Sequence, residues 1–158
     1  GSGLARRGRV DRRRIRRLER ADIVAHALGA DGVQVGSAFA ASMESSAHPN
    51  FKHAIISADE GDTKLSMKSV IPVRLLKNEF FRQVENAEAK GANKEELLEL
   101  LGRGRAKLGM FEGDLTLGEL EIGQASASIK EIRPAAEILR TIWQEFSDRR
   151  DQICKLKF

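Results

Sequence analysis

The residues best suited to chemistry lie in the glycine-punctuated run 29–37. Its central stretch, 31–35, is short and rich in β-branched residues, which predicts a buried strand. Gly36 and Ser37 interrupt that strand before a predicted helical turn at 38–41. Such a turn leaves backbone N–H groups unpaired, and the helix dipole favours an anion beside them. We therefore expect a phosphate to approach the main chain here, although most glycine turns of this kind bind nothing, so a purely structural turn is the alternative.

A second group of candidates is an acidic, glycine-punctuated loop that carries Glu112, Asp114, Glu119 and Glu121. Two carboxylates can act as a general acid and a general base when their pKa values differ. Nothing in the sequence indicates a raised pKa, so we predict a solvated loop instead.

The three histidines do not form an obvious catalytic or metal-binding set. His48 precedes Pro49, which predicts a helix-capping or packing role, whereas His26 and His53 are expected on helix surfaces. No pair of histidines has cysteine or carboxylate support at metal-ligand spacing, so no metal site is predicted. The single cysteine, Cys154, is expected to be a free thiol.

The remaining pattern predicts mostly helices around that one strand. A single strand needs neighbours, so we expect residues 32–36 to pair with another segment or with a second chain. The aromatic side chains of Phe80, Phe81, Trp143 and Phe146 are assigned to the core. Hydrophobic spacing, caps and glycine density predict the other elements in chain order. They are a helix over 12–28, a helix opened by the N-cap and early proline of 46–49 and running to about Ala58, an irregular stretch over 59–71, a long helix from Pro72 to about Lys90, a helix capped by Asn93, loops over 102–124 and a final helix from Pro134.

Composition and charge exclude some classes of protein. Apolar residues make up 41% and charged residues 32% of the chain, and no apolar run approaches the roughly 20 residues that span a bilayer, so no membrane partner is expected. Residues 1–20 contain nine arginines and two acidic residues, Asp11 and Glu19, and so carry a net charge of +7. The whole chain has a net charge of +4, so residues 21–158 carry −3. No aromatic residue interleaves these arginines, so nucleic-acid binding is not expected. The single cysteine and the lack of an apolar signal segment favour a cytoplasmic setting.

Several segments, taken in order, resemble one family of flavin enzymes. Residues 27–39 and 44–52 closely resemble the last barrel strand and the following helix of nitronate monooxygenases, formerly called 2-nitropropane dioxygenases. The segments 73–78, 112–115 and 118–124 are similar to the small helical domain and closing segment of the same superfamily. Enoyl-acyl-carrier-protein reductases that depend on flavin mononucleotide (FMN) share this pattern. The resemblance extends over about residues 22–146.

The resemblance implies an α/β fold, the C-terminal part of a (β/α)8 TIM barrel with a small helical substrate domain. A complete barrel of this type needs about 250 residues, so the 158 residues would supply only its last strand and helices, and would themselves be mostly helical. The implied organisation is an atypical arginine-rich arm at 1–20, the last β/α unit with its phosphate-binding turn at 21–58, the small domain at 59–124, and a closing helix and tail at 125–158.

The resemblance also implies a site for FMN. In the family the segment that ends the last strand contacts the flavin phosphate, which assigns cofactor binding to Gln34, Val35, Gly36 and Ser37. Ser37 keeps the hydroxyl of the threonine that is commoner there. The other half of the phosphate cradle has its nearest counterpart at Gly8, although arginines replace the residues around it. The catalytic histidine of the family lies upstream of the matched segments, so no catalytic residue is assigned in this chain.

The implied activity is that of an FMN-dependent oxidoreductase that oxidises small alkyl nitronates with oxygen. An FMN-dependent enoyl-acyl-carrier-protein reductase is the first alternative, and a non-catalytic fragment or assembly module is the second. The expected partners are the small-molecule substrate and either the missing barrel half or a second chain, which would form a homo-oligomer. The isolated chain is expected to be inactive.

Overall fold

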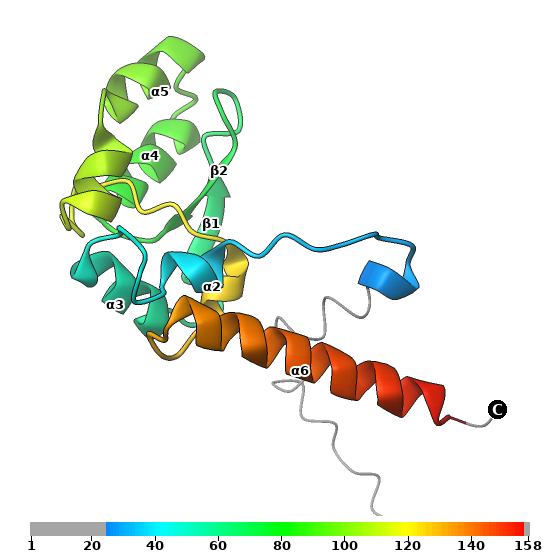
Figure 1. Ribbon diagram of the computed structural model, residues 1–158. Coiled ribbons are helices and arrows are strands. Elements are labelled where there is room, and N and C mark those ends of the chain that lie inside the picture. Colours follow the sequence, from blue (N-terminus) through cyan, green and yellow to red (C-terminus); the bar gives the residue numbers. More distant parts are fainter. Residues whose placement is uncertain (1–24, 157–158) are drawn as a thin grey trace, which may run out of the picture. The chain divides into compact units, whose positions relative to one another are not determined.

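The computed structural model describes residues 25–156. The chain divides into two compact units, one formed by residues 34–141 and the other by residues 25–33 and 142–156 of the described part. The elements in chain order, shown in Figure 1, are α2 (Ser37–Ala40), α3 (Pro49–Ser57), β1 (Thr63–Ser66), β2 (Val73–Leu76), α4 (Glu79–Ala89), α5 (Lys94–Leu101), the π-helix η2 (Lys107–Phe111), the 3-10 helix η3 (Gln124–Ser128) and α6 (Ala135–Cys154).

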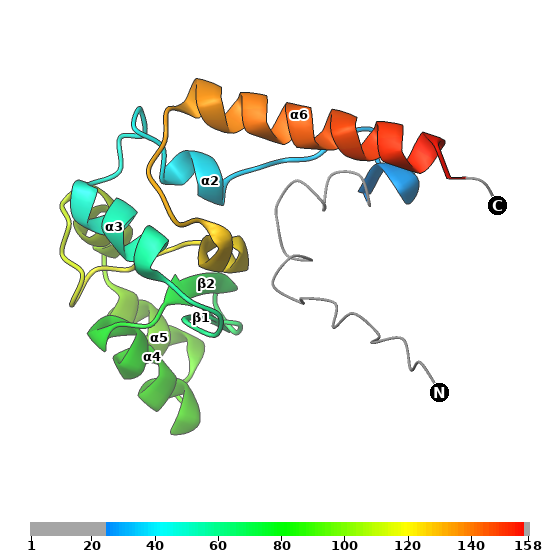
Figure 2. The ribbon, with the colours of Figure 1, turned by 90° about the horizontal axis from the view of Figure 1, so that it is seen from below.

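A small antiparallel sheet organises the larger unit. β1 pairs with β2, with Thr63 opposite Leu76 and Ser66 opposite Val73. The segment 120–122 lies along the other edge of β2, where the amide of Leu76 donates to the carbonyl of Leu120. Seen from below, the hairpin lies between α3 and the α4–α5 pair (Figure 2).

The hairpin corrects two of our sequence predictions. The stretch 59–71, which was expected to be irregular, contains β1, and the helix expected from Pro72 begins only after Asn78. Val73 and Leu76 fit the spacing of the helical stripe. However, an apolar segment of only four residues with buried positions suits a strand equally well, and periodicity cannot distinguish the two. The Asn78 side chain accepts from the amide of Phe81 at 2.8 Å, and this cap starts α4.

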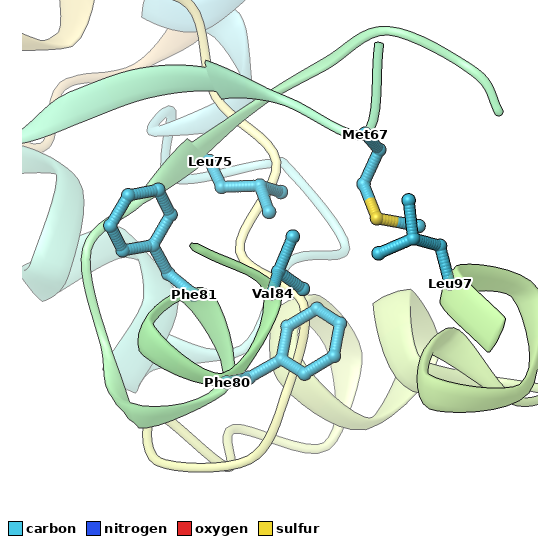
Figure 3. Close-up of a cluster of buried hydrophobic side chains, with 6 residues drawn as sticks. All are labelled: Met67, Leu75, Phe80, Phe81, Val84 and Leu97. Carbon is cyan, nitrogen blue, oxygen red and sulfur yellow. The ribbon is translucent and has the colours of Figure 1, made fainter. Parts of the chain in front are cut away.

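The main hydrophobic cluster joins one face of the hairpin to α4 and α5 (Figure 3). Phe80 and Phe81 are almost completely buried, as expected, and each contributes about 1.5 to 3 kcal/mol through burial. The members of the cluster are Met67, Leu75, Phe80, Phe81, Val84 and Leu97.

Local signals set the ends of the helices as the sequence predicts. Asn93 and Glu96 form a reciprocal capping box at the start of α5, with hydrogen bonds of 2.9 and 2.8 Å. Gly91 follows α4 with a φ of 79°, a conformation that favours glycine. α6 begins directly after Pro134.

The smaller unit contains a short helical turn at 25–27 and most of α6. Gly29, with a φ of 93°, follows that turn and confirms the predicted helix stop, whereas the rest of the predicted helix 12–28 lies outside the described residues. The Trp143 side chain is 66% exposed, so its assignment to the core is wrong for this chain. It stacks on Phe146, three residues along the same helix, and the Phe146 ring also lies against His26. No helix within 25–156 has the length and apolar character that a membrane crossing requires.

Candidate phosphate-binding site

The segment that leads into the site, residues 32–36, is neither helix nor strand. Residues 32–36 have no strand assignment, and Val33 is 43% exposed, so the prediction of a buried strand is wrong for the chain by itself. Among residues 25–156, no backbone group accepts from the amides of this segment. A strand needs neighbouring strands to satisfy its backbone, and residues 25–156 provide none beside this segment. Pairing with another segment or chain stays a prediction.

The turn itself has the expected local shape. Gly36 is the N-cap of α2, with φ −107° and ψ −59°, and Ser37 is the first helical residue. The first bond of the helical turn runs from the amide of Ala40 to the carbonyl of Gly36, at 2.9 Å. Within the described part of the chain, the amides of Gly36 and Ser37 therefore have no backbone acceptor. A Cβ atom at Gly36 would meet no atom of residues 25–156 within 4 Å, so the space on that side of the backbone is open.

The proposed cofactor residues differ in exposure. Gln34 and Gly36 are exposed, whereas Val35 and Ser37 are half-buried. The remaining cofactor candidate, Gly8, lies outside the described residues.

The closing segment, far along the chain, lies against Ser37. η3 lies beside α2, and its N-cap is Gly123 (Figure 1). A Cβ atom at Gly123 would be 2.7 Å from the Oγ of Ser37, closer than real contacts allow. The sequence interpretation missed this contact, because no local pattern links positions so far apart.

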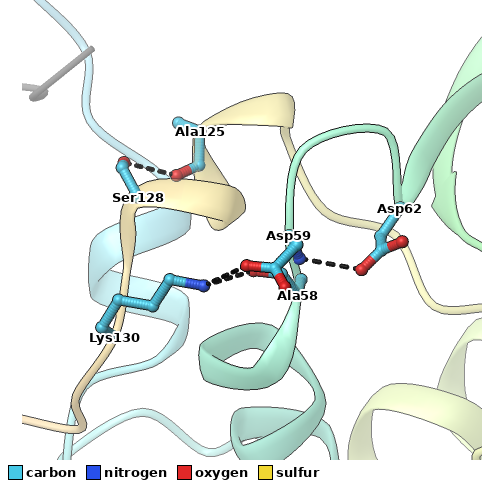
Figure 4. Close-up of polar contacts among 6 residues, drawn as sticks. All are labelled: Ala58, Asp59, Asp62, Ala125, Ser128 and Lys130. Atoms are coloured by element: carbon cyan, nitrogen blue, oxygen red, sulfur yellow. Dashed lines mark hydrogen bonds and ion pairs between the residues drawn. The ribbon is translucent and has the colours of Figure 1, made fainter. Parts of the chain in front are cut away.

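Polar contacts fix η3 in place. The Lys130 ammonium donates to the carbonyl of Ala58 at 2.7 Å and to the Asp59 carboxylate at 2.9 Å, which ties the segment after η3 to the end of α3 (Figure 4). The Ser128 hydroxyl donates to the carbonyl of Ala125 within η3. Ser126 is fully buried, and within the described residues its hydroxyl has no hydrogen-bond partner.

A buried lysine holds the loop that follows α2. Lys52 is 8% exposed, and its ammonium donates to the carbonyls of Met43 and Ser45, at 3.1 and 2.8 Å. On the other side of the loop, the Glu44 carboxylate accepts from the amide of Ala135 at 2.8 Å. Sequence reasoning did not single out Lys52. Lys52 lies three residues before the buried Ile55 and therefore on the same face of the helix, and this spacing could have indicated that Lys52 is buried.

The histidines behave as structural residues. The Nδ1 atom of His48 accepts from the amide of Asn50 at 3.1 Å, which confirms the predicted capping role. The His48 ring also packs against Gly113, where any side chain would overlap it. His53 is exposed, as expected.

The acidic loop is only partly solvated, which corrects our prediction. Two backbone amides donate to the Asp114 carboxylate, from Leu117 and Thr116, and lower its pKa. Glu119 is only 5% exposed, and burial raises its pKa to about 7. The nearby charge of Glu121 adds to that increase, whereas the Arg105 guanidinium opposes it. The sequence could not reveal this burial, because it arises when 120–122 joins the sheet.

Comparisons with known proteins place the chain among flavin-enzyme relatives by sequence and by fold alone. The sequence model of the family described as nitronate monooxygenase matches residues 18–145. The chain is 44% identical over 63 residues to a probable nitronate monooxygenase of Bacillus subtilis (strain 168), a match that covers 40% of this chain and 16% of the relative.

Solved structures give longer matches. FabK from Thermotoga maritima is 34% identical, with a TM-score of 0.76 over 83% of this chain and 42% of that protein. The nitroalkane oxidase of Streptomyces ansochromogenes is 27% identical, with a TM-score of 0.63 over 84% of this chain and 38% of that protein. The chain thus spans less than half the length of these relatives. Because the family model covers most of its residues, the chain belongs to the nitronate monooxygenase family.

Proposed function

We propose that this chain forms part of an FMN-dependent oxidoreductase of the nitronate monooxygenase type. Bound FMN would supply the redox chemistry, taking electrons from a small alkyl nitronate and passing them to oxygen. The residues of this chain would bind the phosphate of the cofactor and shape the substrate side of the site.

The observation that carries the proposal is the open backbone at Gly36 beside the Ser37 hydroxyl. Within the described residues, the amides of Gly36 and Ser37 have no backbone acceptor, and a Cβ atom at Gly36 would meet no atom within 4 Å. Backbone amides and a hydroxyl make charge-assisted hydrogen bonds to a phosphate, which are about twice as strong as neutral ones. These groups are therefore chemically suited to the phosphate end of FMN, with Gln34 and Val35 leading into the turn.

The rest of the barrel would come from outside these 158 residues. The segment 32–36 has no pairing partner among the described residues, and the chain covers about two fifths of the structures it resembles. We propose that this segment pairs with strands of a missing barrel half or of a second chain. That partner would also supply the catalytic base, whereas Gly8 of this chain would contribute to the other half of the phosphate cradle.

An FMN-dependent enoyl-acyl-carrier-protein reductase is the second candidate. The TM-score with FabK is higher than the TM-score with nitroalkane oxidase, which supports this second candidate. Stopped-flow reduction of the bound flavin separates the two. The assembled enzyme should reduce its flavin with an alkyl nitronate and transfer the electrons to oxygen, whereas rapid reduction by NADH or NADPH with no response to nitronate would support the reductase.

A non-catalytic role is tested with the isolated chain. The purified 158-residue protein with added FMN should show no nitronate turnover, because the proposed catalytic base and most of the barrel would come from outside it. Turnover comparable to that of the assembled enzyme would refute both the incomplete-barrel proposal and the assembly-module alternative.

A further inference from the structure

Gly123 occupies a position where the backbone does not require glycine. Its φ of −69° and ψ of 158° lie in the extended region that every amino acid adopts readily. Conformational freedom therefore gives no reason for the missing side chain, in contrast to Gly113 with its φ of 83°.

The reason for a glycine lies in one neighbouring atom. Within the described part of the chain, and apart from residue 123 and its two chain neighbours, the Ser37 Oγ is the single heavy atom that a Cβ at position 123 would approach within 4 Å, and it would do so at 2.7 Å. A methyl group at position 123 would therefore leave the backbone and every other neighbour undisturbed, but it would force the Ser37 hydroxyl to move.

We propose that Gly123 is a positioning residue for the Ser37 hydroxyl, and that the start of η3 forms a second wall of the phosphate site. A serine side chain has three staggered rotamers. The absent side chain at position 123 allows the rotamer in which Oγ lies against η3. A Cβ there drives Oγ into another rotamer and away from the phosphate. This inference rests on the proposed function of the turn at 34–37.

η3 cannot easily yield to relieve such a contact. Ser126 is fully buried within η3, and Ile129, just after it, is 9% exposed. The two hydrogen bonds from Lys130 to the end of α3 hold the following segment (Figure 4). A serine rotamer change requires rotation about one bond, so the displacement falls on Ser37.

The test is a double-mutant cycle on FMN affinity in the chain assembled with the segments that complete the barrel. Ser37→Ala, Gly123→Ala and the double variant are titrated with FMN and with riboflavin, which lacks the phosphate. Ser37→Ala and Gly123→Ala should each weaken FMN binding by about tenfold to a hundredfold. The double variant should bind no more weakly than Ser37→Ala, and riboflavin binding should not change in any variant.

Each contrary result has a distinct meaning. The inference would be overturned if Gly123→Ala bound FMN as tightly as the parent. It would also be overturned if the affinity loss of the double variant were the product of the two single losses. Both results would leave the proposed phosphate turn intact. Equal loss of FMN and riboflavin in Gly123→Ala would show a general packing role and would also overturn it. Parent-like affinity of Ser37→Ala would refute both the inference and the proposed site. Riboflavin binding serves as the control that each variant is folded.

Discussion

Replacing Glu119 with glutamine should stabilise the protein at alkaline pH and have little effect at acidic pH. Glu119 is 5% exposed, and burial raises the pKa of its carboxyl from 4.5 to about 7. Between pH 4.5 and about 7, the Glu119 carboxyl therefore keeps its proton in the folded protein and has lost it in the unfolded chain. Stability linked to this group is fully present below pH 4.5 and is lost as the pH rises through about 7.

The size of the effect follows from the gap between the two pKa values. A gap from 4.5 to about 7 corresponds to about 3 kcal/mol at pH 8, and relaxation of the loop would reduce this to about 1 to 3 kcal/mol. Glutamine has nearly the same shape and carries no charge. Glu119→Gln should therefore unfold at a higher urea concentration than the parent at pH 8, with little difference at pH 5.

Urea unfolding followed by circular dichroism from pH 5 to 8.5 measures this difference directly. The matched control is Glu99→Gln, in which an exposed carboxylate of α5 is neutralised in the same way. A stability gain of Glu119→Gln that does not depend on pH, or a loss at pH 8, would refute the burial argument.

Three further changes test the surrounding structure by thermal and urea unfolding. Lys52→Met should lower the free energy of unfolding by about 1 to 3 kcal/mol, because it leaves two carbonyls of the loop after α2 without a donor, and Lys52→Arg should restore part of the loss. Gly113→Ala should cost about 1 to 3 kcal/mol or more, since it overlaps the His48 ring and strains a positive φ; an unchanged midpoint would contradict this packing. Deleting residues 4–20 should leave the melting temperature nearly unchanged, because crowded arginines offer few core contacts, and a large drop would show that the arm is packed.

The sequence predicts best those features that depend on a few adjacent residues. The cap at His48, the capping box at Asn93 and the start of α6 after Pro134 follow from residue types within one helical turn. The turn at Gly36 and Ser37 belongs to the same class, since it depends on a glycine placed just before a short helix.

Features that depend on distant segments were predicted poorly. Val73 and Leu76 lie in β2 because β1 and residues 120–122 supply its neighbours, although their spacing also fits the stripe of α4. The burial of Glu119 and the approach of Gly123 to Ser37 depend in the same way on the path of the closing segment. Such pairings are set by the packing of the whole unit and leave no local pattern in the sequence.

The phosphate turn is tested most directly by titrating FMN against two variants of the assembled enzyme. A Cβ atom at Gly36 would meet no atom of the described residues within 4 Å, so a valine there should disturb the proposed phosphate site without a clash inside this part of the chain. Ser37→Ala removes one charge-assisted hydrogen bond, worth about 1.5 to 3 kcal/mol, and should weaken binding by roughly tenfold to a hundredfold. Gly36→Val should weaken binding more than Ser37→Ala, with circular dichroism unchanged in both variants. If both variants bind FMN as tightly as the parent, the phosphate lies elsewhere and the proposed site is wrong.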